Sequence, residues 1–114
     1  NHYQDELSKL SIGNCVLLPY IPKNCEHNGH MYHLRFKSQK YRTSFVNRLG
    51  DKGISSQPHY VPLHDSPAGL KFGRTFSDMR NTNRLAECIV RLPLFFDLGI
   101  ENCERVVQAV RETL

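Results

Sequence analysis

The chain lacks the segments that direct a protein into or across a membrane. None of its apolar runs approaches the roughly 18 to 20 residues that a membrane-spanning helix needs. Its first ten residues, NHYQDELSKL, do not have the basic and then apolar order of a signal peptide. These absences predict a cytoplasmic protein that does not associate with membranes. Repeats, low-complexity tracts and linkers are also missing from the sequence.

Cysteine is sparse, and the patterns of the common catalytic classes are missing. Cys15, Cys25, Cys88 and Cys103 do not have the dense spacing of a secreted disulfide scaffold, which predicts reduced thiols. Cys88 and Cys103 fall on apolar faces of predicted helices, where a thiol is usually inert. No nucleophile stands beside a base, and neither common glycine-rich phosphate loop is present. From these patterns we predict no catalytic residue within the chain.

The 114 residues suffice for one domain with a single core. Residue patterns predict the order helix, strand, strand, helix, strand, irregular segment, helix, short strand, helix. This order predicts an α+β fold with a small, mainly antiparallel sheet and helices packed on one face. The predicted helices cover about residues 3–10, 39–49, 77–92 and 100–111, and the predicted strands lie within 14–22, 30–36, 53–60 and 92–98.

Local signals set the expected ends of these helices. Ser38 can cap the second helix, whose apolar face would hold Tyr41, Phe45, Val46 and Leu49, and Gly50 can close it in a left-handed conformation. In the third helix Leu85, Ile89 and Leu92 have helical spacing, and Pro93 would stop it. In the last helix an apolar face would hold Ile100, Cys103, Val106, Val107 and Val110.

The net charge of +4 comes from 15 basic and 11 acidic residues. The basic residues Lys37, Lys40, Arg42 and Arg48 form the one visible group. Such a group is either a solvated helix face or a surface for an anionic ligand or RNA. No RNP-type aromatic motif is present on the predicted strands, so we expect no nucleic-acid partner.

The segment CEHNGHMYH offers four potential zinc ligands, Cys25, His27, His30 and His33. His30 and His33 are three positions apart on a predicted strand, so their side chains would point to opposite faces. We therefore predict no metal site and interpret the segment as a turn with hydrogen-bonded histidines.

The segment QPHYVPLHDSPAG, residues 57–69, holds two histidines and a tyrosine between three prolines. The prolines would stiffen the chain, so His59, Tyr60 and His64 would lose little conformational entropy on contacting a ligand. A rigid surface connection with incidental histidines would have the same composition. The residues alone do not separate these two interpretations.

Three segments, PYIPKNCEHNGHMYHLRF, GISSQPHYVPLHDSPAG and RLAECIVRLPLFFDL, resemble the carboxy-terminal domain of the DegT/DnrJ/EryC1/StrS sugar aminotransferases, which depend on pyridoxal phosphate (PLP). The resemblance covers nearly the whole chain. It implies that residues 1–114 are the small domain of a fold-type I enzyme and that residues 1–12 end the helix joining it to a large PLP-binding domain. In the family the large domain holds the lysine that binds PLP and the aspartate at its pyridine nitrogen, and neither motif is found here.

The resemblance also implies a reaction. An amino group, usually from glutamate, would be transferred to the 4-keto carbon of a dTDP-4-keto-6-deoxy sugar, for cell-surface polysaccharides such as lipopolysaccharide O-antigen or enterobacterial common antigen. His59, Tyr60 and His64 would contact this substrate, and the complete enzyme would be a homodimer. The chain alone would be inactive, would not hold PLP tightly, and would self-associate if the cut exposes apolar surface. The alternative is a free-standing α+β module that binds an anionic ligand or RNA.

Overall fold

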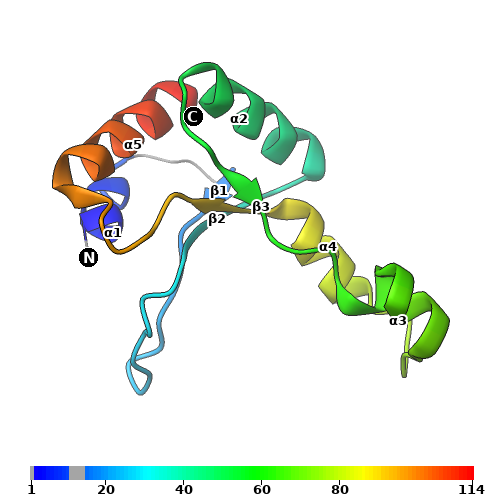
Figure 1. Ribbon diagram of the computed structural model, residues 1–114. Coiled ribbons are helices and arrows are strands. Elements are labelled where there is room, and N and C mark those ends of the chain that lie inside the picture. Colours follow the sequence, from blue (N-terminus) through cyan, green and yellow to red (C-terminus); the bar gives the residue numbers. More distant parts are fainter. Residues whose placement is uncertain (1, 11–14) are drawn as a thin grey trace.

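The computed structural model describes residues 2–10 and 15–114 of the chain. Four antiparallel strands form one sheet in the order β1-β2-β4-β3, and helices cover one of its faces (Figure 1). This arrangement confirms the predicted α+β fold. The elements are α1 (His2–Leu7), β1 (Val16–Leu17), β2 (Tyr32–Phe36), α2 (Gln39–Asp51), β3 (Gln57–Pro58), a 3-10 helix η1 (Leu63–Asp65), α3 (Pro67–Phe72), α4 (Arg80–Cys88), β4 (Ile89–Leu92) and α5 (Gly99–Thr113).

The two central strands, β2 and β4, alternate buried and more exposed side chains. Tyr32 and Leu34 of β2 pair with Leu92 and Val90 of β4, and all four are buried. Because successive side chains of a strand point to opposite faces, these residues define the covered face. The residues between them, His33 and Arg35 in β2 and Ile89 and Arg91 in β4, belong to the opposite face.

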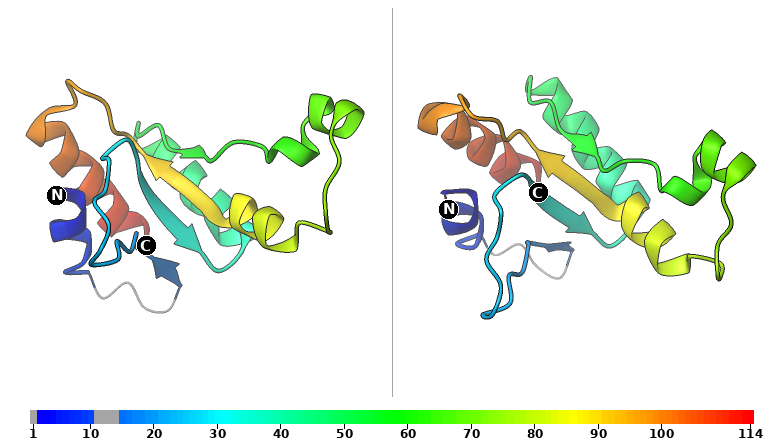
Figure 2. Two further views of the ribbon diagram at one scale, coloured as in Figure 1. Left: turned by 90° about the horizontal axis from the view of Figure 1, so that it is seen from below. Right: turned by 60° about the horizontal axis from the view of Figure 1, so that its bottom comes forward.

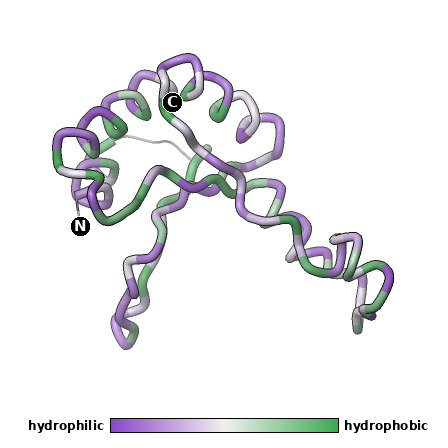
Figure 3. Tube along the Cα trace, viewed as in Figure 1, coloured by the Kyte–Doolittle hydropathy of each residue, from purple (hydrophilic) through white to green (hydrophobic). Residues whose placement is uncertain are grey.

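Helices α2 and α5 pack together over the covered face. Phe45 and Leu49 of α2 and Val106 and Val110 of α5 are buried in the same core as the strand residues. The hydropathy colours agree, since the outer turns of both helices are hydrophilic (Figure 3). Seen from below, the strands lie in front and α2 and α5 lie behind them (Figure 2). These two helices therefore leave the other face of the sheet uncovered.

Two tyrosines attach the short helix α1 to this core. The Tyr3 hydroxyl donates a hydrogen bond to the Pro93 carbonyl over 2.7 Å, and the Tyr32 hydroxyl donates one to Gln4 Oε1 over 2.8 Å. Burial, together with the charge of Asp5, raises the pKa of Tyr32 to about 12. A helix of six residues is marginal alone, so these contacts stabilise α1. It ends at Leu7, earlier than predicted, and residues 11 and 12 lie outside the described residues.

The helix predicted over residues 77–92 is wrong in its last four residues. Helix α4 ends at Cys88, and Ile89–Leu92 form β4, which pairs with β2 and β3. The spacing of Leu85, Ile89 and Leu92 fits a helix, but residues 89–92 form a strand because β2 and β3 pair with them on both sides. Tertiary context often determines whether β-branched residues form strands. Of the strand predicted within residues 92–98, only Leu92 is in a strand, as the last residue of β4, and residues 93–98 form none.

The glycine that turns the chain after α2 is Gly53 rather than Gly50. Gly53 has φ +72°, whereas Gly50 lies inside the helix. The Gly53 amide donates to the Gly50 carbonyl over 2.8 Å, so the helix continues past the predicted stop before it turns. The Ser38 cap is confirmed, since its hydroxyl accepts a hydrogen bond from the Tyr41 amide.

Some residues predicted on apolar helix faces are exposed. Tyr41 in the first turn of α2 and Ile100 in the first turn of α5 both lie outside the core. The beginnings of these helices extend past the sheet, so only their later turns bury side chains. The predicted strands are also shorter than expected, with β1 and β3 having two residues each.

Two segments project from the core (Figure 1). One is the connection between β1 and β2, and the other is an arm made of η1, α3 and α4. Helix α3 was not predicted, although Ser66 caps it by accepting a hydrogen bond from the Gly69 amide and Pro67 occupies its first turn. Five large apolar side chains of the arm are exposed: Leu63, Leu70, Phe72, Phe76 and Leu85.

Candidate functional site

The uncovered face of the sheet brings together two of the chain's basic side chains. His33 of β2 and Arg91 of β4 are register partners, and Arg91 also pairs with Gln57 of β3. His33 Nδ1 and Arg91 Nε are buried atoms without a hydrogen-bond partner. An unpartnered buried polar atom costs free energy, so a hydrogen bond to either nitrogen would be favourable.

His59 and Tyr60 continue this group from the end of β3. The rings of His59 and Tyr60 lie 5.0 Å apart, and the Arg91 guanidinium lies 4.8 Å from the centre of the Tyr60 ring. Arg91 Nη1 is 3.5 Å from the Tyr60 hydroxyl oxygen, to which it donates. His59 Nδ1 is a third buried nitrogen without a partner. We call His33, His59, Tyr60 and Arg91 the sheet-face cluster.

The sheet-face cluster disfavours positive charge on His33. Burial lowers the pKa of this imidazole, and the nearby side chains of His59, His27 and Arg35 lower it further. An anion beside the cluster would reverse the effect of these neighbours. The electrostatics therefore suit a negatively charged ligand.

His64 lies apart from the cluster, in η1. Its Nε2 is 2.6 Å from Asn83 Oδ1 of α4 and 3.5 Å from Asp65 Oδ2. Since an amide oxygen only accepts, Nε2 carries the proton and donates it. The His64 side chain retains 15% of its exposure, so the ring is held between η1 and α4.

The three predicted site residues line two separate hollows. His59 and Tyr60 line one of about 310 Å³, and its other polar lining residues are Arg42, Asn83 and the acidic Asp65 and Glu87. His64 lines another of about 500 Å³, between η1, α3 and the segment that precedes α4. Asn83 joins them, because it lines the first hollow and bonds to the histidine of the second. A substrate-binding role for His59, Tyr60 and His64 stays a prediction. The structure adds neighbours that the sequence did not indicate as binding residues: His33, Arg91 and Asn83.

The side chains that line these two hollows include groups that donate or accept hydrogen bonds. In the part of the chain that the structure describes, no serine or cysteine is hydrogen-bonded to a histidine, and no three His, Cys, Asp or Glu side chains could hold one metal ion. Cys88 is buried as predicted, and Cys103 is partly buried against the core. All six lysines are exposed, and none lines either hollow.

The model of the DegT/DnrJ/EryC1/StrS aminotransferase family matches residues 1–111. The chain belongs to this family. It is 28% identical over 119 residues to the UDP-4-amino-4-deoxy-L-arabinose–oxoglutarate aminotransferase of Shewanella sediminis, covering 97% of this chain and 30% of the relative. It is 26% identical over 102 residues to the spore coat polysaccharide biosynthesis protein SpsC of Bacillus subtilis, covering 85% of this chain and 26% of the relative.

Solved structures of this family have the same fold. The crystal structure of DesV from S. venezuelae, in complex with a ketimine intermediate, matches with a TM-score of 0.80 and 26% identity over 97% of this chain. The match covers 29% of DesV, so the chain spans less than a third of the relatives it resembles. Two further structures with this fold represent a PLP form and a complex with the cofactor PMP.

The family is one of aminotransferases, and the relatives named above include one that acts on a UDP-linked sugar. Among the described residues, no helix is long and apolar enough to cross a membrane.

Proposed function

We propose that residues 1–114 form the small carboxy-terminal domain of a PLP-dependent sugar-nucleotide aminotransferase, with residues 1–12 ending the helix that joins the two domains. The match over residues 1–111 and the share of the relatives' length support this assignment. The large domain would lie against the uncovered face of the sheet. The exposed lysines fit this proposal, since a lysine that binds PLP lies in an enclosed site.

The uncovered face would form one wall of the substrate site. The observation that carries this proposal is the set of three buried nitrogens without partners, on His33, His59 and Arg91. A nucleotide sugar supplies hydroxyl and phosphate oxygens that accept hydrogen bonds from such groups. His59 and Tyr60 would contact the sugar or its diphosphate, and His64, held by Asn83, would line the adjoining edge.

The chain's residues would bind and orient the substrate. When bound, PLP supplies the electron sink for the exchange of an amino group. His59, Tyr60 and His64 would hold the nucleotide sugar in place and exclude water, and we assign no proton transfer to them. The lysine that moves protons would come from the large domain.

The substrate we propose is a dTDP-4-keto-6-deoxy sugar, with glutamate as amino donor, as for a dTDP-4-amino-4,6-dideoxygalactose transaminase. The product would enter a cell-surface polysaccharide, such as lipopolysaccharide O-antigen or enterobacterial common antigen. The name of SpsC supports a role in polysaccharide synthesis. We further propose a cytoplasmic homodimer without nucleic-acid or membrane partners.

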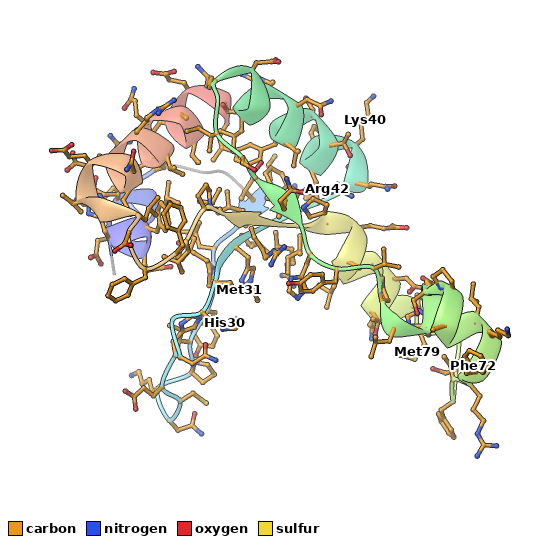
Figure 4. The ribbon with its side chains drawn as sticks, viewed as in Figure 1. His30, Met31, Lys40, Arg42, Phe72 and Met79 are labelled. Carbon is orange, nitrogen blue, oxygen red and sulfur yellow. The ribbon has the colours of Figure 1, made fainter. Side chains whose placement is uncertain are left out.

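Substitutions in the complete enzyme test the substrate wall. His59→Gln should raise KM for the nucleotide sugar at least ~10-fold with little change in kcat, because it removes a hydrogen bond to a charged ligand. His30→Gln is the matched control, since His30 lies on the projecting β1–β2 connection and bonds to Asn28 (Figure 4). Equal KM values for His59→Gln and the unaltered enzyme would contradict the proposal.

A further inference from the structure

A separate pocket lies where α4 crosses the end of β2. Helix α4 continues directly into β4, which pairs with β2, so the last turns of the helix lie beside the end of that strand. The pocket between them has a volume of about 560 Å³. It shares no lining residue with the hollows of His59 or His64. Its described lining consists of Cys15, Leu17, Arg35, Phe36, Lys37, Asn81, Arg84, Leu85 and Cys88.

Among the described residues, three cations line this pocket and no acidic side chain does. Arg35 is in β2, Lys37 directly follows β2, and Arg84 is in α4. Some basic side chains elsewhere have acidic partners, as Arg111 has with Glu6 and Lys52 with Glu112. Like charges in one concave site repel one another unless an anion neutralises them.

The four basic residues that stand close together in the sequence, Lys37, Lys40, Arg42 and Arg48, do not form a single surface. Arg42 Nε donates to the Glu87 carbonyl over 3.0 Å, and Arg48 Nη2 donates to the Glu112 carbonyl over 3.3 Å. Lys40 lies on α2 and points away from the sheet (Figure 4). Of the four, Lys37 alone lines the pocket.

The other residues that line the pocket favour a small molecule over a bare ion as its ligand. Leu17, Leu85 and the buried Phe36 and Cys88 give apolar surface beside the cations, and the amide of Asn81 can donate or accept. Pockets of a few hundred Å³ with apolar walls and a few polar groups are typical of sites for small molecules.

We propose that this pocket binds a small molecule that carries a phosphate or diphosphate group, held by Arg35, Lys37 and Arg84. Guanidinium groups match phosphate oxygens with two parallel hydrogen bonds, and a multiply charged phosphate neutralises three cations better than one carboxylate does. The site shares no lining residue with the hollows of His59 and His64, although Arg35 belongs to the same uncovered face of the sheet. It does not depend on the proposed substrate wall.

Calorimetric titration of the 114-residue chain tests this site. Inorganic phosphate, diphosphate and UDP are titrated at one ionic strength, and we expect diphosphate and UDP to bind more tightly than phosphate. Tighter binding of UDP than of diphosphate would show that the nucleoside contacts the apolar surface. Equal affinities would show that the pocket binds the diphosphate group alone. Either result supports the proposal.

Matched variants locate the binding. Arg84→Gln and Lys37→Gln should each weaken diphosphate binding at least ~10-fold, the loss expected for a hydrogen bond to a charged group. Lys40→Gln removes the same charge outside the pocket and should leave the affinity unchanged. All three side chains are exposed, so the variants should retain the fold, which amide NMR spectra verify. Diphosphate should shift the amides of Leu85 and Cys88.

Three results would overturn the proposal. One is an absence of diphosphate binding, and another is an equal loss of affinity in Lys37→Gln and Lys40→Gln, which would indicate diffuse charge. The third is tighter binding of a single-stranded oligonucleotide than of diphosphate, which would assign the basic residues to RNA.

Discussion

His33 illustrates at the scale of one residue how burial and neighbours act together. Its pKa is lowered by burial first and then by its neighbours His59, His27 and Arg35, while Arg91 faces it from β4. In the unfolded chain the same imidazole titrates near its ordinary value of 6.5. As the pH falls below 6.5, the unfolded chain therefore binds a proton before the folded chain does, and the folded state loses stability.

We predict that the chain is less stable at about pH 5.5 than at about pH 7.5 and that His33→Gln reduces this difference. Urea unfolding midpoints at the two pH values, for the unaltered chain and the variant, provide the measurement. His30→Gln, which changes an exposed histidine, should preserve the difference. An identical pH dependence in unaltered and His33→Gln protein would show that His33 does not titrate as described.

Sequence patterns identified individual residues unevenly. His59, Tyr60 and His64 stood out because proline-rich segments with histidines are unusual. Arg91 was hidden within a predicted helix, so its place beside His33 depended on recognising β4. Asn83 gave no signal, because a contact across 19 residues between η1 and α4 has no local pattern.

At the scale of elements, the end of α2 gives a direct test of backbone conformation. Gly50 is helical and has nothing within 4 Å of an added Cβ, whereas Gly53 has φ +72°. A side chain stabilises a helix interior relative to glycine but is strained in the left-handed region.

Gly50→Ala should therefore raise the free energy of unfolding by about 0.5 to 1 kcal/mol. Gly53→Ala should lower it by about 1 to 2 kcal/mol. Chemical denaturation of both variants measures the two changes. Destabilisation by Gly50→Ala with no effect of Gly53→Ala would restore the predicted helix end at Gly50.

The elements themselves were predictable where one local pattern dominates. The alternation of Tyr32, Leu34 and Phe36 and the Ser38 cap specified β2 and the start of α2. The segment Ile89–Leu92 satisfies both a helical and a strand pattern, and only its pairing with β2 and β3 decides between them. Long-range pairing of this kind cannot be read from a local window.

For the whole molecule, the main feature is a sheet with one covered and one open face. Helices α2 and α5 bury the apolar side chains, while His33, His59 and Arg91 on the other face keep unpartnered nitrogens. The arm and the β1–β2 connection project from the same core (Figure 1). This arrangement fits a domain that completes a site formed with another part of an enzyme.

The most direct test is an assay of amino transfer from glutamate to a dTDP-4-keto-6-deoxy sugar, in which the amount of product formed is measured. It compares the 114-residue chain with the protein translated from the complete reading frame that contains it. We predict turnover, together with the absorbance of bound PLP, for the longer protein alone. Turnover by the 114 residues on their own, or none by a longer protein that binds PLP, would contradict this account.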